Sequence, residues 1–408
     1  MKNRVVITGN GSISPLGPDS KSLWKNLLDG QSGVDYIQQF DTGNFSVKIA
    51  GEVKEFDPNN FFDPKEVKRL DRFTMFALIA AKQAIEQSNY SSSDSGVIVG
   101  TGVGGMHTLE EEHSKYIKKG QRGVSPFYVP KMIPNIAGGQ IAIKNNLTGL
   151  NFSMSTACSS ATDAIGMAYR LISDGHINSM VCGGAEGSIT PLTLSGFANM
   201  KALSKNNDNP AEASKPFDKD RDGFILSEGA GMLFLENLES AQKRNAKILG
   251  EIIGYGITND AYHITQPHNE STGAANAMKM AINDAGIEAK NVDYINAHGT
   301  STYFNDILET QAIRNVFKSY AADVSISSTK SMTGHLLGAA GSIEVIACMN
   351  AINYSKVPPT INYKSPDSEC DLNYTPNFAI EKRIEIAMSN SFGFGGHNSV
   401  VILKKFSS

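Results

Sequence analysis

The chain lacks the features that define several classes of protein. It has only four cysteines in 408 residues and none of them forms a CxxC pair, so a disulfide framework is excluded. No apolar run approaches the roughly 18 residues of a membrane span, and the opening MKNRVVITGNG contains no signal-type apolar region. The net charge of −4 argues against attraction of the whole surface to nucleic acid or anionic membranes. We therefore expect a soluble protein of a reducing compartment, the cytoplasm.

The residues that are present indicate an α/β protein with two domain-sized units. The chain is longer than one simple core usually holds, and 40% apolar with 19% charged residues is a globular composition. Short β-branched runs alternate with segments of helical spacing, which is typical of buried sheets covered by helices. The predicted strands are 4–8, 96–100, 179–182 and 292–297, and the predicted helices are 72–88 and 160–173.

The chain also contains an internal repeat. Residues 151–170 (NFSMSTACSSATDAIGMAYR) run from a strand through Ser-Thr and small residues into a helix, and residues 324–347 follow the same plan. We therefore predict two similar halves, 1–246 and 247–408, joined through a basic helical segment.

Cys158 is the candidate nucleophile. It lies where a predicted strand ends and a helix of small residues begins, and the unpaired N–H groups of a helix N-terminus favour a thiolate over a thiol. The alternative is that Cys158 is a small buried side chain, which is the interpretation we give to Cys182, Cys348 and Cys370. The position alone does not decide between the two.

Two histidines occupy settings similar to that of Cys158. His298 follows a predicted strand, and His335 follows another in TKSMTGHLLGAAG, so both lie in strand-to-helix turns, where α/β enzymes place catalytic groups. Asp306 and Glu309 are predicted to form a capping box for the helix after His298. A zinc set of Cys158 and the two histidines is an alternative, but the separations (158 to 298 is 140, 298 to 335 is 37) match no short metal pattern.

Three further segments look functional. Gly100, Gly102 and Gly105 imitate a dinucleotide fingerprint, but no acidic residue follows at the required distance, so we predict close backbone packing near a site. In 389–399 (SNSFGFGGHNS), glycines allow backbone N–H groups to point at a ligand, as an oxyanion hole requires. The polar connection 203–224 is longer than most connections in a compact domain and is therefore predicted to have a function.

Four motifs in order along the chain carry a family resemblance. They are STACSSA around Cys158, NAHGTST around His298, STKSMTGHLLGAAG around Lys330 and His335, and NSFGFGGHN near the end. With them the chain resembles the β-ketoacyl-acyl-carrier-protein synthases nearly from end to end, and most closely their elongating group, synthase II. The resemblance implies a thiolase-like, duplicated, five-layered αβαβα fold that is normally a homodimer. It also implies an acyltransferase of fatty-acid biosynthesis, which condenses an acyl thioester with malonyl-acyl-carrier protein and releases CO₂.

The resemblance assigns chemical roles to individual residues. Cys158 would hold the acyl chain covalently, and the backbone N–H groups of Cys158 and Phe394 would form its oxyanion hole. His298 and His335 would donate hydrogen bonds to the enolate that decarboxylation produces.

A charged pair accompanies this set. Lys330 would add positive charge and fix His335, with Glu344 as its counter-charge. No metal and no cofactor are expected, since the carrier protein supplies the phosphopantetheine arm; whether a monovalent cation binds near Glu344 is left open.

The resemblance also implies a substrate channel. Its positions are Thr300 and Thr302, toward the malonyl-pantetheine arm, and Val103, Phe197, Phe392 and Phe394, in the acyl pocket and its gate. Three residues depart from the family pattern: Tyr303 and Phe304 stand where proline and a small residue are usual, and His397 stands where threonine is common. Because the aromatic pair is bulky, the channel could be reshaped, and the preferred chain length stays open.

Basic residues are the predicted docking site for the acidic carrier protein. They are Lys65, Lys68, Arg69 and Arg72, at the spacing of one helix face, then Lys118, Lys119 and Arg122, and Lys201 beside Phe197. A positive rim would steer and orient the carrier, whereas the alternative is a solvated helix face.

Related enzymes are the remaining alternatives. A thiolase needs a second catalytic cysteine, which the C-terminal glycine loop lacks, and an initiating synthase has asparagine where this chain has His335. A chain-length-factor partner is non-catalytic and lacks the nucleophile, so Cys158 argues against it. An active homologue in a specialised polyketide or lipid pathway stays open.

Overall fold

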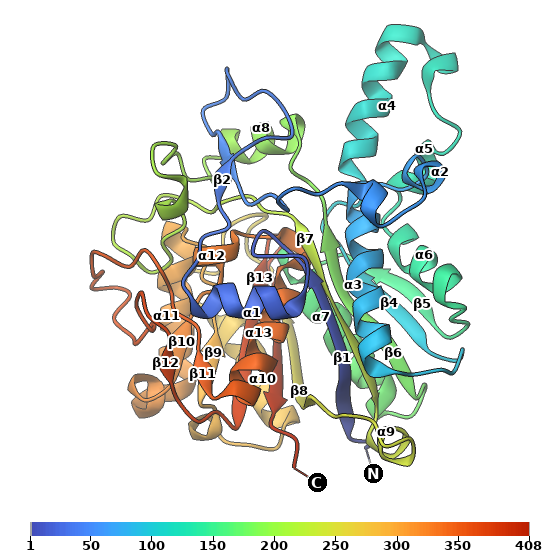
Figure 1. Ribbon diagram of the computed structural model, residues 1–408. Helices are drawn as coiled ribbons and strands as arrows, with labels where there is room; N and C mark the ends of the chain where they lie inside the picture. Colours follow the sequence, from blue (N-terminus) through green and yellow to red (C-terminus); the bar gives the residue numbers. More distant parts are fainter. Residues whose placement is uncertain (1, 408) are drawn as a thin grey trace.

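The computed structural model describes residues 2–407, and its centre is one mixed sheet of ten strands (Figure 1). The strand order is β10-β9-β13-β14-β8-β1-β7-β6-β4-β5. The first half of the chain contributes β1 (Val5–Ile13), β7 (Gly229–Asn237), β6 (Ser179–Glu186), β4 (Gly96–Gly100) and β5 (Asn151–Met154). The second half contributes β8 (Gly250–Asn259), β14 (His397–Lys404), β13 (Ile386–Gly393), β9 (Tyr294–Asn296) and β10 (Ser325–Ser327).

The two sides of this sheet repeat one another. In the first half β4 is parallel to β5 and β6, whereas β6 and β1 are antiparallel to β7. In the second half β9 is parallel to β10 and β13, whereas β13 and β8 are antiparallel to β14. The halves meet where residues 5–7 of β1 pair with residues 250–252 of β8. The predicted duplication is therefore confirmed.

Helices form three layers around the two halves of the sheet (Figure 1). The outer face of the first half is covered by α3 (Arg72–Ser88) and α6 (Ile136–Asn145), and that of the second half by α10 (Thr272–Asp284) and α11 (Tyr303–Phe317). Between the halves lie α7 (Ser160–Ser173) and α13 (Ala340–Tyr354). These layers form the five-layered αβαβα arrangement that the sequence predicts.

Shorter elements complete the structure. The other helices are α1 (Ser20–Leu28), α2 (Pro64–Val67), α4 (Met106–Lys119), α5 (Tyr128–Met132), α8 (Pro191–Asn199), α9 (Leu238–Lys243) and α12 (Lys330–Thr333). The short strands β2 (Asp35–Tyr36) and β3 (Ile49–Ala50) pair with each other, as do β11 (Lys356–Val357) and β12 (Ile380–Glu381). The 3-10 turns η3 (Ala157–Ser159) and η7 (Leu337–Ala339) precede α7 and α13. Within residues 2–407, no helix is both long and apolar enough to cross a membrane.

Most elements that the sequence predicts are present with small differences in length. The predicted helices 72–88 and 160–173 coincide with α3 and α7, and the predicted strand 96–100 coincides with β4. Strand β1 continues beyond its predicted end through Gly9 and Gly11, where a side chain would collide with the backbone of α3. These glycines therefore serve close packing and not a turn.

The basic segment 64–72 does not form the single helix that its spacing predicts. Helix α2 ends before Lys68, and α3 begins at Arg72, where the Asp71 side chain caps its first turn. The Arg72 guanidinium donates two hydrogen bonds, of 2.5 and 2.7 Å, to the buried carboxylate of Glu228. The prediction of one basic helix face is wrong, because a capped helix start interrupts the segment and Arg72 points into the protein.

The polar connection 203–224 holds the first half against loops of the second. The Ser214 hydroxyl donates to the backbone oxygen of Lys330 at 2.7 Å, and the Lys215 N–H donates to the Ser301 hydroxyl at 3.0 Å. The connection therefore braces both the segment that begins α12 and the loop that follows β9.

The two central helices cross at Gly341. A Cβ atom at this position would collide with the Thr162 hydroxyl of α7 and would lie 3.0 Å from the Ser391 hydroxyl of β13. These two hydroxyls are hydrogen-bonded to each other at 2.7 Å. The close approach places η3 and η7 in contact at the N-terminal ends of the two helices.

We predict that Gly341→Ala lowers the free energy of unfolding by about 1–3 kcal/mol, because overpacking forces the central helices apart. The measurement is urea unfolding followed by circular dichroism. The matched control is Gly196→Ala in α8, where nothing lies within 4 Å of the added Cβ, so the variant gains about 0.5–1 kcal/mol from helix propensity. Equal stability of the two variants would contradict the crossing as described.

Candidate active site

Cys158 lies in the turn η3, between β5 and α7. Ala157, the residue before it, has a φ of +51°, in the left-handed region that side chains disfavour. Two hydrogen bonds hold this turn: the Thr156 N–H donates to the Ser160 hydroxyl at 2.9 Å, and the Thr156 hydroxyl donates to the Asp163 carboxylate at 2.5 Å. The turn therefore presents the cysteine from a fixed backbone.

The second half contains the same turn without the nucleophile. In η7, Leu337 has a φ of +48° and precedes Gly338, just as Ala157 precedes Cys158. The repeat is thus visible at the level of single residues, and only the first half places a thiol at this position.

His298 and His335 come together in the second half. Their ring centroids are 5.3 Å apart, with an interplanar angle of 85°, and both side chains are buried. Burial lowers the pKa of each imidazole well below its usual value, and the positive charge of Lys330 lowers both further. The two rings are therefore neutral at neutral pH. Their Nδ1 atoms have no hydrogen-bond partner among the described residues.

Lys330 is the buried cation of the site. Its ammonium group pairs with the Glu344 carboxylate of α13, and both side chains are almost completely buried. Burial raises the pKa of Glu344, whereas Lys330 opposes this shift. No set of three or more His, Cys, Asp or Glu side chains within residues 2–407 is grouped to hold a metal ion, so the zinc alternative gains no support.

The Gly-rich turn between β13 and β14 closes over Cys158. Ser159 ties the two turns together, because its hydroxyl contacts the backbone oxygens of Ser391 (3.1 Å) and His397 (3.2 Å). A side chain at position 393 would force a shift, since its Cβ atom would lie 2.8 Å from the backbone oxygen of Thr156 and 3.1 Å from the Cys158 nitrogen. The Phe394 N–H then faces the Cys158 sulfur and lowers the thiol pKa through a hydrogen bond.

Burial nevertheless dominates the ionisation of Cys158. It raises the pKa of the thiol to about 12, against the opposing effects of Lys330 and of the Phe394 N–H. The expectation that the helix N-terminus favours a thiolate is therefore outweighed in the free protein, since Cys158 is only 9% exposed. The resting nucleophile is a thiol.

A series of aromatic contacts joins Phe394, beside Cys158, to the two histidines. Successive ring centroids are 5.3–6.4 Å apart along Phe394, Phe197, Phe224, His335, His298 and Phe392. The hydroxyls of Thr300 and Thr302 lie 2.9 Å from each other on the loop after His298, and Val103 is 41% exposed. Aromatic residues of both halves thus form one continuous series of contacts from Phe394 to the two histidines.

The predicted capping box of Asp306 and Glu309 is wrong. No side chain caps the start of α11, and both carboxylates are buried. Glu309 instead accepts the N–H groups of His298 (2.8 Å) and Gly299 (2.7 Å) and the Asn390 amide (3.1 Å), and burial raises its pKa to about 7. It holds the histidine loop, a role that sequence reasoning missed. The signal was available, because Glu309 falls on the apolar face of α11.

The predicted docking residues lie at the surface. They are Lys65, Lys68, Arg69, Arg122 and Lys201, and all five are exposed. The Arg69 guanidinium lies 4.9 Å from the Phe127 ring centroid, which orders one of these cations.

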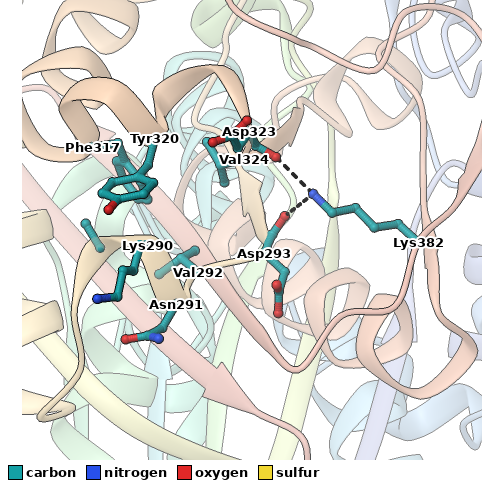
Figure 2. Close-up of a pocket in the computed structure, with 10 residues that line it drawn as sticks. Lys290, Asn291, Val292, Asp293, Phe317, Tyr320, Asp323, Val324 and Lys382 are labelled. Carbon is teal, nitrogen blue, oxygen red and sulfur yellow. Dashed lines mark hydrogen bonds between the residues drawn. The ribbon is translucent and has the colours of Figure 1, made fainter.

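A separate hollow of about 540 Å³ lies on the second half (Figure 2). Its most buried cation, Lys382, donates to the backbone oxygens of Asp293 (3.0 Å) and Asp323 (3.1 Å) and to the Ser325 hydroxyl (3.1 Å). An ammonium group has three protons, so none remains for a ligand. The hollow contains no predicted site residue, and we assign it no part in the function.

Comparisons with known proteins agree with this geometry. Residues 2–241 match the family model "Beta-ketoacyl synthase, N-terminal domain" and residues 249–364 match "Beta-ketoacyl synthase, C-terminal domain". The chain is 48% identical to the 3-oxoacyl-[acyl-carrier-protein] synthase 2 of Synechocystis sp., with 99% of each chain covered. It is 49% identical to the enzyme of that name from Staphylococcus aureus, with 99% of this chain and 98% of the relative covered.

Solved structures show the same fold along the whole chain. The ishigamide ketosynthase/chain length factor has a TM-score of 0.93 and 33% identity, with 100% of each chain covered. A type II polyketide ketosynthase, solved with its acyl-carrier protein and bound to the hexaketide, gives the same TM-score, identity and coverage.

The high thiol pKa predicts that alkylation of Cys158 by iodoacetamide accelerates about tenfold per pH unit between roughly pH 7 and 10. The rate is measured by intact mass, with Cys158→Ala as the unlabelled control. In a Lys330→Met/Glu344→Gln variant the rate falls throughout this range, because the charge that favours the thiolate is absent. A plateau near pH 8 in the wild type would show that burial does not control the thiol.

Proposed function

The chain belongs to the β-ketoacyl synthase family, and from this premise we propose that it elongates fatty acids by decarboxylating Claisen condensation. Its substrates are an acyl thioester and malonyl-acyl-carrier protein, and its products are 3-oxoacyl-acyl-carrier protein and CO₂. One observation carries the proposal: a thiol faces the Phe394 N–H, and a continuous series of ring contacts joins Phe394 to two neutral imidazoles. That set suits acyl transfer followed by enolate chemistry.

In the first half-reaction Cys158 accepts the acyl chain. Its sulfur attacks the thioester carbonyl, the bond to the carrier's sulfur breaks, and the thiol proton leaves with the departing carrier thiol. The N–H groups of Cys158 and Phe394 stabilise the oxyanion of the tetrahedral intermediate. The apolar surroundings then suit the acyl chain.

In the second half-reaction malonyl-acyl-carrier protein loses CO₂ and becomes an enolate. Imidazole N–H groups of His298 and His335 donate hydrogen bonds to the developing enolate oxygen. In this step both rings act as neutral hydrogen-bond donors and not as strong bases. The enolate carbon attacks the acyl-Cys158 carbonyl, the carbon–sulfur bond breaks, and the released Cys158 thiolate takes up a proton from solvent. Burial, reinforced by the charge of Lys330 paired with Glu344, keeps both histidines neutral.

The substrate arm approaches along residues that supply no chemistry. We assign the malonyl-pantetheine arm to Thr300 and Thr302, and the acyl pocket and gate to Val103, Phe197 and Phe392. The reaction needs no cofactor of its own, since the arm belongs to the carrier. The boundary between the halves is placed at 246/247, in the connection from β7 through α9 to β8.

A second copy of the chain is proposed to pair with β5. This strand is the edge of the sheet, and its outer partner position is empty in the single chain. Around it Ile143, Leu150 and Phe152 are 74%, 45% and 36% exposed, which is unusual beside an unpaired edge. A homodimer in the cytoplasm would cover this edge and these side chains.

A polyketide pathway is the second candidate. It is favoured by one fold neighbour at 33% identity, the ketosynthase solved with a type II polyketide acyl-carrier protein. The relatives that are 48–49% identical are named 3-oxoacyl-[acyl-carrier-protein] synthase 2, and we therefore place elongation of fatty acids first.

We predict that the two half-reactions respond to different substitutions. His298→Ala and His335→Ala each slow malonyl decarboxylation by about 10²–10³-fold, because an oxyanion donor is lost. Both variants keep acylation of Cys158, which is measured by intact mass after incubation with acyl-carrier-protein thioesters of several chain lengths.

The reverse pattern is expected for the nucleophile. Cys158→Ser abolishes acylation and condensation, since a serine alkoxide is inaccessible without a dedicated base, whereas Cys158→Gln retains decarboxylation. Equal losses of both half-reactions in the histidine variants would mean that the histidines act as thiol bases. Acylation of Cys182, Cys348 or Cys370 would overturn the assignment of the nucleophile.

The predicted docking residues Lys65 and Arg69 should make binding of the carrier protein depend on salt. Reversing charge with Lys65→Glu and Arg69→Glu raises KM for carrier-bound substrates, most steeply at low ionic strength, because the acidic carrier is no longer attracted. Small pantetheine thioesters are nearly unaffected. The control is Lys82→Glu with Lys243→Glu, two exposed lysines on α3 and α9. A similar KM change for both substrate types would place docking elsewhere.

A further inference from the structure

The turn that carries Cys158 is tied to the helix after it by one buried carboxylate. Asp163 lies in the first turn of α7 and is fully buried. Its carboxylate accepts the hydroxyl of Thr156, the residue two positions before Cys158, at 2.5 Å. A negative charge is favourable at this end of a helix. Asp163 therefore holds the turn η3 against the start of α7.

The same carboxylate reaches the second half of the chain. The Tyr255 hydroxyl of β8 donates to its other oxygen at 2.7 Å, and Tyr255 is almost completely buried. Hydrogen bonds to an ionised acceptor are stronger than those between neutral groups. Tyr255, Asp163 and Thr156 thus form one hydrogen-bonded chain, which runs from a strand of the second half to the turn of the candidate nucleophile.

Tyr255 is held in place independently of Asp163. Its ring packs on α7 at Gly166, where an added Cβ atom would lie 2.2 Å from a ring carbon. Its backbone N–H donates to the Asp284 carboxylate at 3.1 Å, and the same carboxylate accepts Arg170 of α7 at 2.8 Å. The Tyr255 hydroxyl therefore approaches Asp163 from a fixed position.

The turn needs support of this kind because its backbone is strained. Ala157 has a φ of +51°, and a side chain in the left-handed region persists only where the surrounding structure holds it. Thr156, next to Ala157, is held by Asp163 through its hydroxyl and by Ser160 through its N–H. The N–H of Cys158 follows within two residues, so its direction depends on how firmly Thr156 is held.

We propose that Asp163 and Tyr255 are positioning residues, through which the second half of the chain sets the direction of the Cys158 N–H. The proposal rests on the proposed function, in which this N–H and the Phe394 N–H stabilise the oxyanion during acylation. Phe394 and Tyr255 both belong to the second half, so the hydrogen-bonded chain keeps the two donors aligned with each other. Neither positioning residue contacts the substrate, because each acts through Thr156.

The first test is Tyr255→Phe, which removes one hydroxyl and keeps the ring against α7. We expect acylation of Cys158 by acyl-carrier-protein thioesters, followed by intact mass, to slow about tenfold, since a misdirected oxyanion donor loses part of its effect. Thr156→Val removes the hydroxyl at the other end of the hydrogen-bonded chain and should slow acylation similarly. The double variant should be little slower than either single variant, because both act through Asp163.

Tyr169→Phe is the matched control. Tyr169 is a buried residue of α7 whose hydroxyl donates to the backbone oxygen of Ile253 in β8 at 3.2 Å. The variant therefore removes a hydrogen bond between the same two elements, but one that does not lead to the turn of Cys158. We expect its acylation rate to stay within twofold of the wild type.

Substitution of Asp163 itself tests the middle of the hydrogen-bonded chain. Asp163→Ala should slow acylation at least as much as Tyr255→Phe. Asp163→Asn should restore most of the rate, because an amide can accept one hydroxyl through its oxygen and donate to the other through its nitrogen. An asparagine variant as slow as the alanine variant would contradict the hydrogen-bonded chain.

Alkylation of Cys158 by iodoacetamide separates positioning from loosening of the fold. This reaction does not use the oxyanion donors, so its rate at pH 8 should change less than twofold in Tyr255→Phe. A large increase would show that the thiol has lost the burial that raises its pKa to about 12, and the role of Tyr255 would then be structural. Unchanged acylation in Tyr255→Phe would also overturn the proposal. Failure of the proposed function looks different, because no thioester would then acylate wild-type Cys158.

Discussion

The contact between α7 and α13 at Gly341 is the constraint on which the arrangement of the site depends. Each helix begins at a tight turn, and the absence of a side chain at Gly341 lets the two helices approach until those turns touch. The turn of the first half carries Cys158, and the segment just before the turn of the second half carries His335. A duplicated fold of this kind therefore produces one site from two equivalent edges, and the distance between the helices sets the spacing of the reacting groups.

The protonation states of the site residues follow from their burial around one group that stays charged, the Lys330 ammonium. Desolvation alone would leave thiol, imidazoles and Glu344 uncharged, and the Lys330 ammonium is the group that opposes or reinforces each of these shifts. Its charge favours the thiolate of Cys158 and the neutral form of both histidines, which suits both halves of the proposed reaction. The buried pair with Glu344 thus acts on protonation, whereas its net contribution to stability is expected to be small.

The sequence predicted the candidate catalytic residues better than it predicted the buried residues that hold them in place. The strand-to-helix position of Cys158 and the repeat are readable because both are local patterns. The predictions of a capping box and of a single basic helix are wrong for the same reason. Glu309 and Arg72 are charged residues in sequence patterns typical of protein surfaces. In the structure, both are hydrogen-bonded to buried residues that lie far away in the sequence. The first partner set includes Asn390, and the second is Glu228. The thiol pKa could not be predicted either, because it depends on how completely the folded chain removes water.

The second turn of the duplicated pair also limits what the enzyme can become. Gly338 occupies the position equivalent to Cys158, but a Cβ there would collide with the Gly102 nitrogen and lie 2.7 Å from the Glu186 carboxylate. That carboxylate accepts the N–H groups of both Gly102 and Gly338, at 2.7 and 3.0 Å. A cysteine at this position would have to break these hydrogen bonds, which join the two halves. As long as those hydrogen bonds are kept, only the turn of the first half has room for a cysteine side chain, so the repeat does not provide a second thiol at the equivalent position.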